Sequence, residues 1–246
     1  MRLQGKTAIV TGAGSGFGAG IARRFAAEGA RVMVVDRNGA AARVVAEEIG
    51  GLAEVADVAD GRAVTAMADR ALRDMGRIDI LVNNAGITHA PKPLEEVTEE
   101  EFDRVLAVNA KSVFLTARAI VPKMKAQGQG AILNVASTAG LSPRPRLNWY
   151  NASKGWMITA TKTMAVELAP AGVRVNAICP VAGETPLLKS FMGEDTPEMR
   201  ARFLATIPLG RFSTPEDMAA AALYLCSDEA AMVTGVALEV DGGRCI

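Results

Sequence analysis

The chain has 246 residues, half of them hydrophobic and 22% charged, and this composition is typical of a compact globular protein. The 27 basic residues balance the 27 acidic ones, so binding to nucleic acid, which depends on a basic excess, is not expected. The single histidine, His89, excludes a histidine-rich metal site. It lies in a proline-containing stretch that we expect to be a surface loop, so a hydrolase with a Ser–His–Asp triad is not expected either.

Neither a membrane segment nor a metal site is expected from the sequence. The longest purely apolar run, from Ala219 to Cys226, is far too short to cross a bilayer, and the first residues lack the apolar core of a signal peptide. The three cysteines, Cys179, Cys226 and Cys245, have no metal-binding or disulfide spacing. We therefore expect free thiols, no bound metal and a cytoplasmic location.

Short apolar strands alternate with helical segments along the whole chain. In chain order, we expect strands at Thr7–Val10, Arg31–Val35, Ile78–Val82, Ala131–Val135, Val173–Ile178 and Val236–Val240. We expect helices at Ile21–Glu28, Ala40–Ile49, Ala63–Met75, after the capping-box pair Thr98 and Glu101, and after Tyr150. Apolar strands separated by helices indicate a doubly wound α/β fold, in which a parallel sheet is covered by helices on both faces.

The organisation predicts one domain over residues 1–246. No proline-rich or charged linker interrupts the alternation of strands and helices. The one irregular segment, residues 181–215, is too long for an ordinary connection between elements. We expect it to contain short helices and to act as a lid over a substrate.

A glycine-rich loop follows the first expected strand and opens the first helix. Its sequence is Gly12-Ala-Gly14-Ser15-Gly16-Phe17-Gly18. Glycines allow a sharp turn and let a pyrophosphate approach the free N–H groups of a helix N-terminus. The strand before the loop and the helix after it favour a dinucleotide-binding Rossmann fold.

Asp36 ends the second expected strand, where a carboxylate accepts hydrogen bonds from the adenosine ribose and repels a 2′-phosphate. This favours NAD(H) over its phosphorylated form. The neighbouring Arg37 is able to pair with such a phosphate, so use of the phosphorylated form stays open.

Further motifs follow in a characteristic order. Asn83-Asn84-Ala85-Gly86 comes after one central strand, Ser137 after the next, and Tyr150-Asn-Ala-Ser-Lys154 opens a helix. Together with the glycine-rich loop, these motifs resemble the short-chain dehydrogenase/reductase family over essentially the whole chain.

The resemblance implies roles for four residues. Tyr150 is the expected general acid/base, and Ser137 is expected to hydrogen-bond the substrate oxygen. Lys154 lies at i+4 from Tyr150, so we expect its ammonium beneath the phenol, where it lowers the phenol pKa from about 10. Asn109 is expected to hold a water of the proton relay.

The resemblance also implies contacts with the cofactor and a loop that departs from the family pattern. Val181 replaces the usual glycine after Pro180, and Gly183 comes two residues later. The expected cofactor contacts are Gly12, Ser15, Gly16, Phe17, Gly18, Asp36, Arg37, Asp57, Val58, Asn84, Ala85, Gly86, Tyr150, Lys154, Pro180 and Thr185.

The substrate is less well defined by the sequence. Glu184 would attract a cation whereas Arg144 and Arg146 would attract an anion, so the charge of the substrate stays open. The expected substrate-pocket residues are Leu141, Trp149, Glu184, Leu187 and Leu188.

These observations predict an NAD(H)-dependent oxidoreductase that interconverts a secondary alcohol and its ketone, with an aliphatic or alicyclic body. A 3-oxoacyl-[acyl-carrier-protein] reductase is the alternative within the family. A nucleotide-binding scaffold without turnover is the alternative from another class. The resemblance further implies a small-molecule substrate and a homotetramer. The tetramer is expected to form through the long helices around residues 109–125 and after Tyr150, and through the C-terminal strand.

Overall fold

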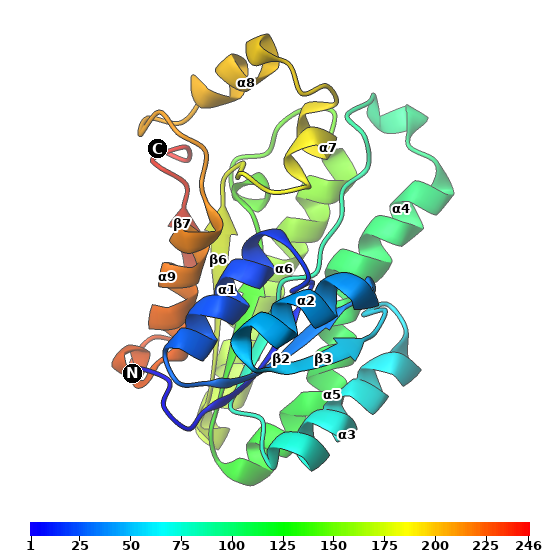
Figure 1. Ribbon diagram of the computed structural model, residues 1–246. Helices are drawn as coiled ribbons and strands as arrows, with labels where there is room; N and C mark the ends of the chain where they lie inside the picture. Colours follow the sequence, from blue (N-terminus) through cyan, green and yellow to red (C-terminus); the bar gives the residue numbers. More distant parts are fainter.

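The computed structural model describes all 246 residues and contains one sheet of seven parallel strands (Figure 1). The strand order is β3-β2-β1-β4-β5-β6-β7, so the chain moves outward from β1 in one direction and from β4 in the other. The strands are β1 Thr7–Thr11, β2 Arg31–Asp36, β3 Leu52–Val55, β4 Ile80–Asn83, β5 Gly130–Val135, β6 Val173–Pro180 and β7 Ala237–Val240.

Helices cover both faces of this sheet. One apolar core lies between the sheet and α1, α2 and α9, and a second lies between the sheet and α3, α5 and α6 (Figure 1). The helices are α1 Gly16–Ala27, α2 Gly39–Ile49, α3 Gly61–Met75, α4 Glu99–Leu106, α5 Ser112–Gln127, α6 Asn148–Leu168, α7 Leu188–Met192, α8 Pro197–Leu204 and α9 Pro215–Cys226. The predicted doubly wound α/β fold is confirmed.

Local differences from the sequence-based expectations have physical causes. Strand β3 was not among the expected strands, because it lies at the sheet edge and no residue in it is fully buried. Helix α1 begins at Gly16, earlier than the expected Ile21, because packing against α9 overrides the low helix propensity of the glycines. The capping box of Thr98 and Glu101 is present at the start of α4.

His89 does not lie on an open surface loop. Its side chain is only 2% exposed, and its Nδ1 atom lies 2.9 Å from the carbonyl oxygen of Ala90. The loop is held down because the N–H of Lys92 donates to the carbonyl oxygen of Arg146 at 3.0 Å. The expectation that the stretch around His89 is a surface loop was therefore wrong for this side chain, which is buried.

A buried polar network ties the centre of the sheet to two helices. Asn83 Nδ2 on β4 donates to Asn134 Oδ1 on β5 at 2.9 Å, and Asn134 Nδ2 donates to Thr161 Oγ1 on α6 at 2.9 Å. Thr116 Oγ1 on α5 donates to Asn83 Oδ1 at 2.9 Å. Because its amides are bonded, this polar core fixes the register of the elements below the site without unpaired groups.

Residues 181–215 form a separate lobe above the carboxyl ends of the strands, with α7 and α8 at the top of the view in Figure 1. Apolar side chains of this segment make their own small core, apart from the two cores on the sheet. The buried members of that core are Val181, Leu188, Met192, Ile207 and Phe212.

One continuous helical stretch, Glu99–Gln127, is long and apolar enough to cross a membrane by length and composition alone. It comprises α4, a π-helical turn at Ala107–Lys111 and α5. Helix α5 packs against α3 and contributes Ile120 and Met124 to the core beneath the sheet. This placement is that of a core helix in a globular protein.

Candidate active site

A single cavity of about 560 Å³ lies along the carboxyl ends of the central strands. The loops after β1, β2, β4, β5 and β6 all contribute to it, as the reversal of strand order at β1 and β4 predicts. Fifteen of the predicted cofactor contacts and Ser137 line it together. They are Gly12, Ser15, Gly16, Phe17, Asp36, Arg37, Asp57, Val58, Asn84, Ala85, Gly86, Ser137, Tyr150, Lys154, Pro180 and Thr185.

At one end of the cavity, the Asp36 carboxylate is held by backbone N–H groups. Its Oδ2 atom accepts from Gly14 N at 3.0 Å and its Oδ1 atom accepts from Asn38 N at 2.9 Å. Each oxygen keeps a lone pair for a further donor. The carboxylate is therefore fixed in position and still able to accept hydrogen bonds from a diol.

Beside it, the N-terminus of α1 faces the cavity. Ser15 is the N-cap residue, but its side chain makes no capping hydrogen bond, and both Ser15 and Gly16 line the cavity. The N–H groups of the first helical turn are therefore open to an anion.

Gly18 lies beneath this loop and not in the cavity lining. A Cβ atom at Gly18 would lie 2.4 Å from both the Gly12 carbonyl oxygen and Asn84 Nδ2. Only a glycine allows the helix to approach the loop this closely. The predicted contact of Gly18 with a cofactor is thus replaced by a packing role.

Ser137, Tyr150 and Lys154 meet at the other end of the cavity. Tyr150 and Lys154 come from the first turns of α6, and Ser137 comes from the loop after β5. All three are buried, and Ser137 Oγ accepts from Ala139 N at 3.1 Å. Lys154 Nζ donates to the carbonyl oxygen of Val135 at 2.8 Å and lies 5.9 Å from the centroid of the Tyr150 ring.

Burial dominates the titration of this pair. It raises the pKa of Tyr150 to about 12, although a hydrogen bond with Ser137 acts in the opposite direction. Burial lowers the pKa of Lys154 to about 8. The expected lowering of the Tyr150 pKa by Lys154 is therefore absent from the chain alone, because desolvation of the phenolate outweighs the hydrogen bond with Ser137 and Lys154 is not among the causes of the shift.

Asn109 lies in the π-helical turn and does not line the cavity. Its Nδ2 atom donates to the Ile87 carbonyl oxygen at 2.9 Å and to Ser153 Oγ at 3.0 Å. Its Oδ1 atom accepts from Ile87 N at 2.9 Å. Both amide hydrogens are used, so this side chain holds Ile87, which lines the cavity, and donates to no relay water.

Four of the expected substrate-pocket residues lie outside the cavity lining, and only Leu187 lies in it. Leu141 is exposed, and Trp149 packs edge-on against Phe102 with ring centroids 5.3 Å apart. Glu184 pairs with Arg200 at 3.3 Å, and Leu188 is buried in the small core of residues 181–215. We correct these four assignments, because Leu141 faces solvent and the other three side chains have different partners.

The loop around Gly183 explains the departure at Val181. A Cβ atom at Gly183 would lie 2.3 Å from Phe17 Cζ, so glycine is required where this loop crosses the Phe17 ring. Pro180 and Thr185 reach the cavity on either side of the crossing.

Several lining residues were missed by the sequence-based reasoning. They are Arg104, Asn151 and Phe203. Phe191 also lines the cavity, with its ring centroid 5.1 Å from that of Tyr150, and it comes from the segment 181–215 that was expected to act as a lid. Asn151 directly follows the general acid/base candidate in the sequence, and this position was the one available signal.

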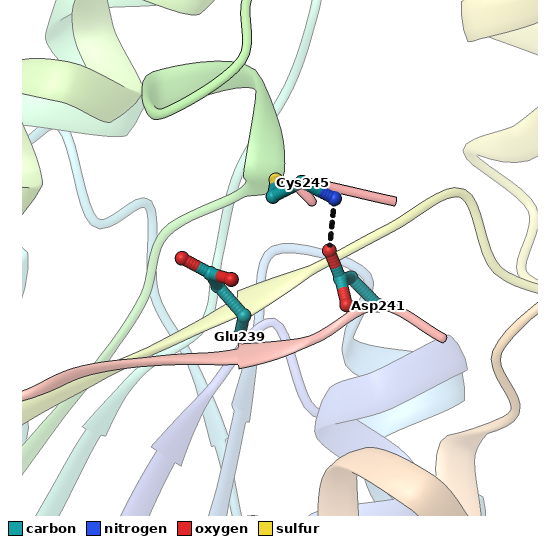
Figure 2. Close-up of side chains that lie close together, drawn as sticks. All are labelled: Glu239, Asp241 and Cys245. Atoms are coloured by element: carbon teal, nitrogen blue, oxygen red, sulfur yellow. Dashed lines mark hydrogen bonds between the residues drawn. The ribbon is translucent and has the colours of Figure 1, made fainter. Parts of the chain in front are cut away.

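A cluster of Glu239, Asp241 and Cys245 lies at the end of β7, outside the cavity lining (Figure 2). The Asp241 carboxylate accepts from Gly243 N at 2.9 Å and from Cys245 N at 2.8 Å. Burial raises the pKa of the Cys245 thiol to about 11, so the thiol is protonated near neutral pH. These contacts account for the cluster as the support of a C-terminal turn.

The chain resembles known proteins over its whole length. A family model described as enoyl-(acyl carrier protein) reductase matches residues 12–244. A 4-formylbenzenesulfonate dehydrogenase of Comamonas testosteroni is 50% identical, with all of both chains covered. The chain belongs to the short-chain dehydrogenase/reductase family. It is therefore an oxidoreductase acting on CH–OH donors.

Solved structures of other short-chain dehydrogenases/reductases share the fold. A 3-ketoacyl-(acyl-carrier-protein) reductase from Brucella melitensis, complexed with NADH, is 52% identical with a TM-score of 0.95, covering 99% of this chain and 100% of that chain. An NAD+-bound xylitol dehydrogenase is 32% identical with a TM-score of 0.92, covering 99% of this chain and 100% of that chain.

Proposed function

We propose that this short-chain dehydrogenase/reductase interconverts a secondary alcohol and its ketone with NAD(H) as the cofactor. The observation that carries the proposal is a single cavity with Asp36 and the open N-terminus of α1 at one end and Ser137, Tyr150 and Lys154 at the other.

The residues around the cavity fit a dinucleotide. Asp36 would accept hydrogen bonds from the adenosine ribose, and the first turn of α1 would bind the diphosphate. Asp57 and Val58 would lie along the adenine, and Thr185 and Lys154 would lie at the nicotinamide end. When bound, the cofactor supplies or accepts the hydride. The NADH and NAD+ of the two related structures support this choice.

Residues of the chain itself supply the proton and stabilise the charge that develops on the substrate oxygen. With a pKa of about 12, the Tyr150 phenol is protonated at neutral pH, which is the form that gives a proton to a ketone oxygen. Ser137 would hydrogen-bond the same oxygen as negative charge develops on it. Lys154, fixed by Val135, places a positive charge beside the phenol. The presence of all three residues in one cavity argues against a scaffold without turnover.

A 3-oxoacyl-[acyl-carrier-protein] reductase is the second candidate, and the Brucella melitensis structure favours it by name and by 52% identity. That protein was solved with NADH, so a preference for NADH does not separate the two functions. The two functions are separated by the substrate, a simple ketone in one case and a 3-oxoacyl thioester in the other.

Residues 181–215 are proposed to act as a lid over the substrate. Phe191 on α7 stacks edge-on against Tyr150, so this segment covers the reacting end of the cavity. Its separate apolar core lets α7 and α8 move as a unit relative to the sheet.

We also propose a homotetramer in the cytoplasm. Exposed apolar side chains on α5 and α6, among them Phe114, Trp156 and Val166, support an interface between copies of the chain. Three free cysteines are compatible with a reducing compartment. Light scattering coupled to size exclusion tests the oligomeric state, and a monomer would remove this part of the proposal.

The function is tested by following reduced-nicotinamide absorbance with a panel of ketones and 3-oxoacyl thioesters, with NADH and NADPH in parallel. Turnover of ketones with NADH supports the proposal. Preferred turnover of the thioesters supports the carrier-protein reductase, and no turnover of either class by a protein that binds NADH contradicts both.

A further inference from the structure

The substrate end of the cavity carries positive charge without a compensating carboxylate. Arg144 lies there beside Phe203 and Asn151, whereas the only lining carboxylates are Asp36 at the end of β2 and Asp57 after β3. Glu184, the one acidic residue that the sequence offered against an anion, lies outside the lining and pairs with Arg200. The structure thus removes the conflict of charges that the sequence left open.

Most hydrogen-bond donors of the Arg144 guanidinium have no partner in the chain. Its Nη2 atom donates to Thr206 Oγ1 at 2.9 Å, and its Cζ atom lies 4.3 Å from the centroid of the Phe203 ring. A guanidinium has five N–H donors, so most remain free. Neither Arg144 nor Arg104 takes part in any ion pair of the structure. Burial and the positive charge of Arg244 both lower the pKa of Arg144, as expected for an uncompensated cation.

Asn151 hydrogen-bonds to the backbone of Arg144. Its Nδ2 atom donates to the Arg144 carbonyl oxygen at 2.7 Å, which fixes the orientation of the amide. Its Oδ1 atom is buried without any partner, although Asn151 is only 8% exposed and lines the cavity. A buried acceptor left open at a cavity wall is costly unless a ligand satisfies it.

The loop that carries Arg144 is braced on both sides. Arg146 has a φ of 70°, the only positive value outside glycine, and its carbonyl oxygen accepts from Lys92 N at 3.0 Å. Arg244 Nη1 donates to Ser142 Oγ at 3.1 Å. Backbone strain that is maintained by such contacts is typical of ligand-binding loops.

Resting on the proposed function, we propose that the substrate carries an anionic group, a carboxylate or a sulfonate, that Arg144 binds at the end of the substrate remote from the reacting carbonyl. Phe191 and Phe203 pack against the apolar body between these two ends. Asn151 positions Arg144 and offers its free Oδ1 atom to a donor of the substrate.

The test compares 4-acetylbenzoate with its neutral methyl ester. We expect the wild-type enzyme to reduce the anion with a kcat/KM about 10- to 100-fold higher, the range of a charge-assisted hydrogen bond. Arg144→Met should remove this preference, so that the ratio of kcat/KM for the anion to that for the ester falls to about 1, and Arg144→Lys should restore part of it. Arg146→Met removes the same charge from an exposed side chain outside the cavity lining and should keep the full preference.

A purely structural role for Arg144 is the competing explanation: its hydrogen bond to Thr206 would only hold the segment that follows α8. Thr206→Val removes that hydrogen bond but no charge, so it should keep the preference for the anion. Loss of the preference in Thr206→Val to the same extent as in Arg144→Met, or equal rates for acid and ester in the wild type, would overturn the proposal.

Binding is measured separately by calorimetry on the enzyme saturated with NAD+, which does not reduce the ketone. Arg144-dependent binding of 4-acetylbenzoate without turnover of any ketone would sustain this inference while the proposed function fails. Turnover of neutral ketones without Arg144-dependent binding of the anion would support the proposed function and overturn this inference. If Arg144→Met lowers kcat/KM only for acetoacetyl-pantetheine 4′-phosphate and not for 4-acetylbenzoate, Arg144 binds the phosphate of a carrier. That result would overturn the proposal of a small anionic substrate.

Discussion

Lys154 Nζ lies 5.9 Å from the centroid of the Tyr150 ring while it donates a 2.8 Å hydrogen bond to the Val135 carbonyl oxygen. The lysine is therefore held by β5 and not by the Tyr150 phenol. Burial moves the two pKa values in opposite senses, to about 8 for Lys154 and about 12 for Tyr150. Near neutral pH the pair is a charged ammonium beside a protonated phenol.

Tyr150→Phe should lower kcat for ketone reduction by about 10²- to 10⁴-fold, the usual contribution of a general acid. The ring stays in place against Phe191, so the dissociation constant for NADH, measured by fluorescence titration, should not change. A variant that retains wild-type turnover would remove Tyr150 from the mechanism.

The rate of ketone reduction should fall as the pH rises through about 8, because Lys154 loses its charge there while Tyr150 stays protonated until about 12. The measurement is kcat against pH with saturating NADH. In Lys154→Met, kcat should be low and lack this alkaline decline. A wild-type profile that is flat to pH 10 would contradict the assignment.

The lowered pKa of Lys154 also makes the free energy of unfolding depend on pH. The folded pKa of Lys154, about 8, lies below the ordinary lysine pKa of 10.5 that applies in the unfolded chain. The charged lysine therefore disfavours folding below pH 8, and this penalty fades as the pH rises toward 10.5. Urea denaturation should show that Lys154→Met gains stability over the wild type at pH 7 and less at pH 10.

Asp36→Ala should reduce the preference for NAD(H) over the phosphorylated cofactor, because it removes both the acceptor for the ribose and the repulsion of a 2′-phosphate. The measurement is the ratio of kcat/KM for NADH and NADPH. Arg37→Ala is the matched control and should change mainly the rate with NADPH. An unchanged ratio in Asp36→Ala would assign the preference to other residues.

Asn109→Ala should lower the free energy of unfolding by about 2–4 kcal/mol, since it leaves both backbone groups of Ile87 without their partner and removes the donor to Ser153 Oγ. Denaturation in urea measures this loss. Because Ile87 lines the cavity, KM for the ketone should rise as well. A stable variant with an unchanged KM would show that Asn109 does not position the wall.

Gly18→Ala should destabilise the chain and abolish NADH binding, because its methyl group would lie 2.4 Å from the Gly12 carbonyl oxygen in the loop itself. Gly155→Ala is the control, since its methyl group would meet only the Gly140 oxygen at 3.7 Å, an ordinary contact. Thermal denaturation with and without NADH compares the two. Equal behaviour of both variants would contradict the close approach.

The sequence by itself determined the features that depend on neighbours along the chain. Apolar strands separated by helices required a parallel sheet covered on both faces, because such strands must be buried on both sides. The glycine-rich loop and the i+4 spacing of Tyr150 and Lys154 lie within single local units, so their place could be predicted. Strand β3, with its partly exposed residues, gave too weak a pattern to be found this way.

Only the tertiary structure decided which side chains line the cavity. Trp149 packs on Phe102 and Glu184 pairs with Arg200. Arg144 lines the cavity and contacts Asn151 on α6 and Phe203 on α8. The direction of a side chain and the cost of burying its charge depend on atoms far away in the sequence. For the same reason, the pKa values of Tyr150 and Lys154 followed from desolvation in the folded chain and not from their spacing.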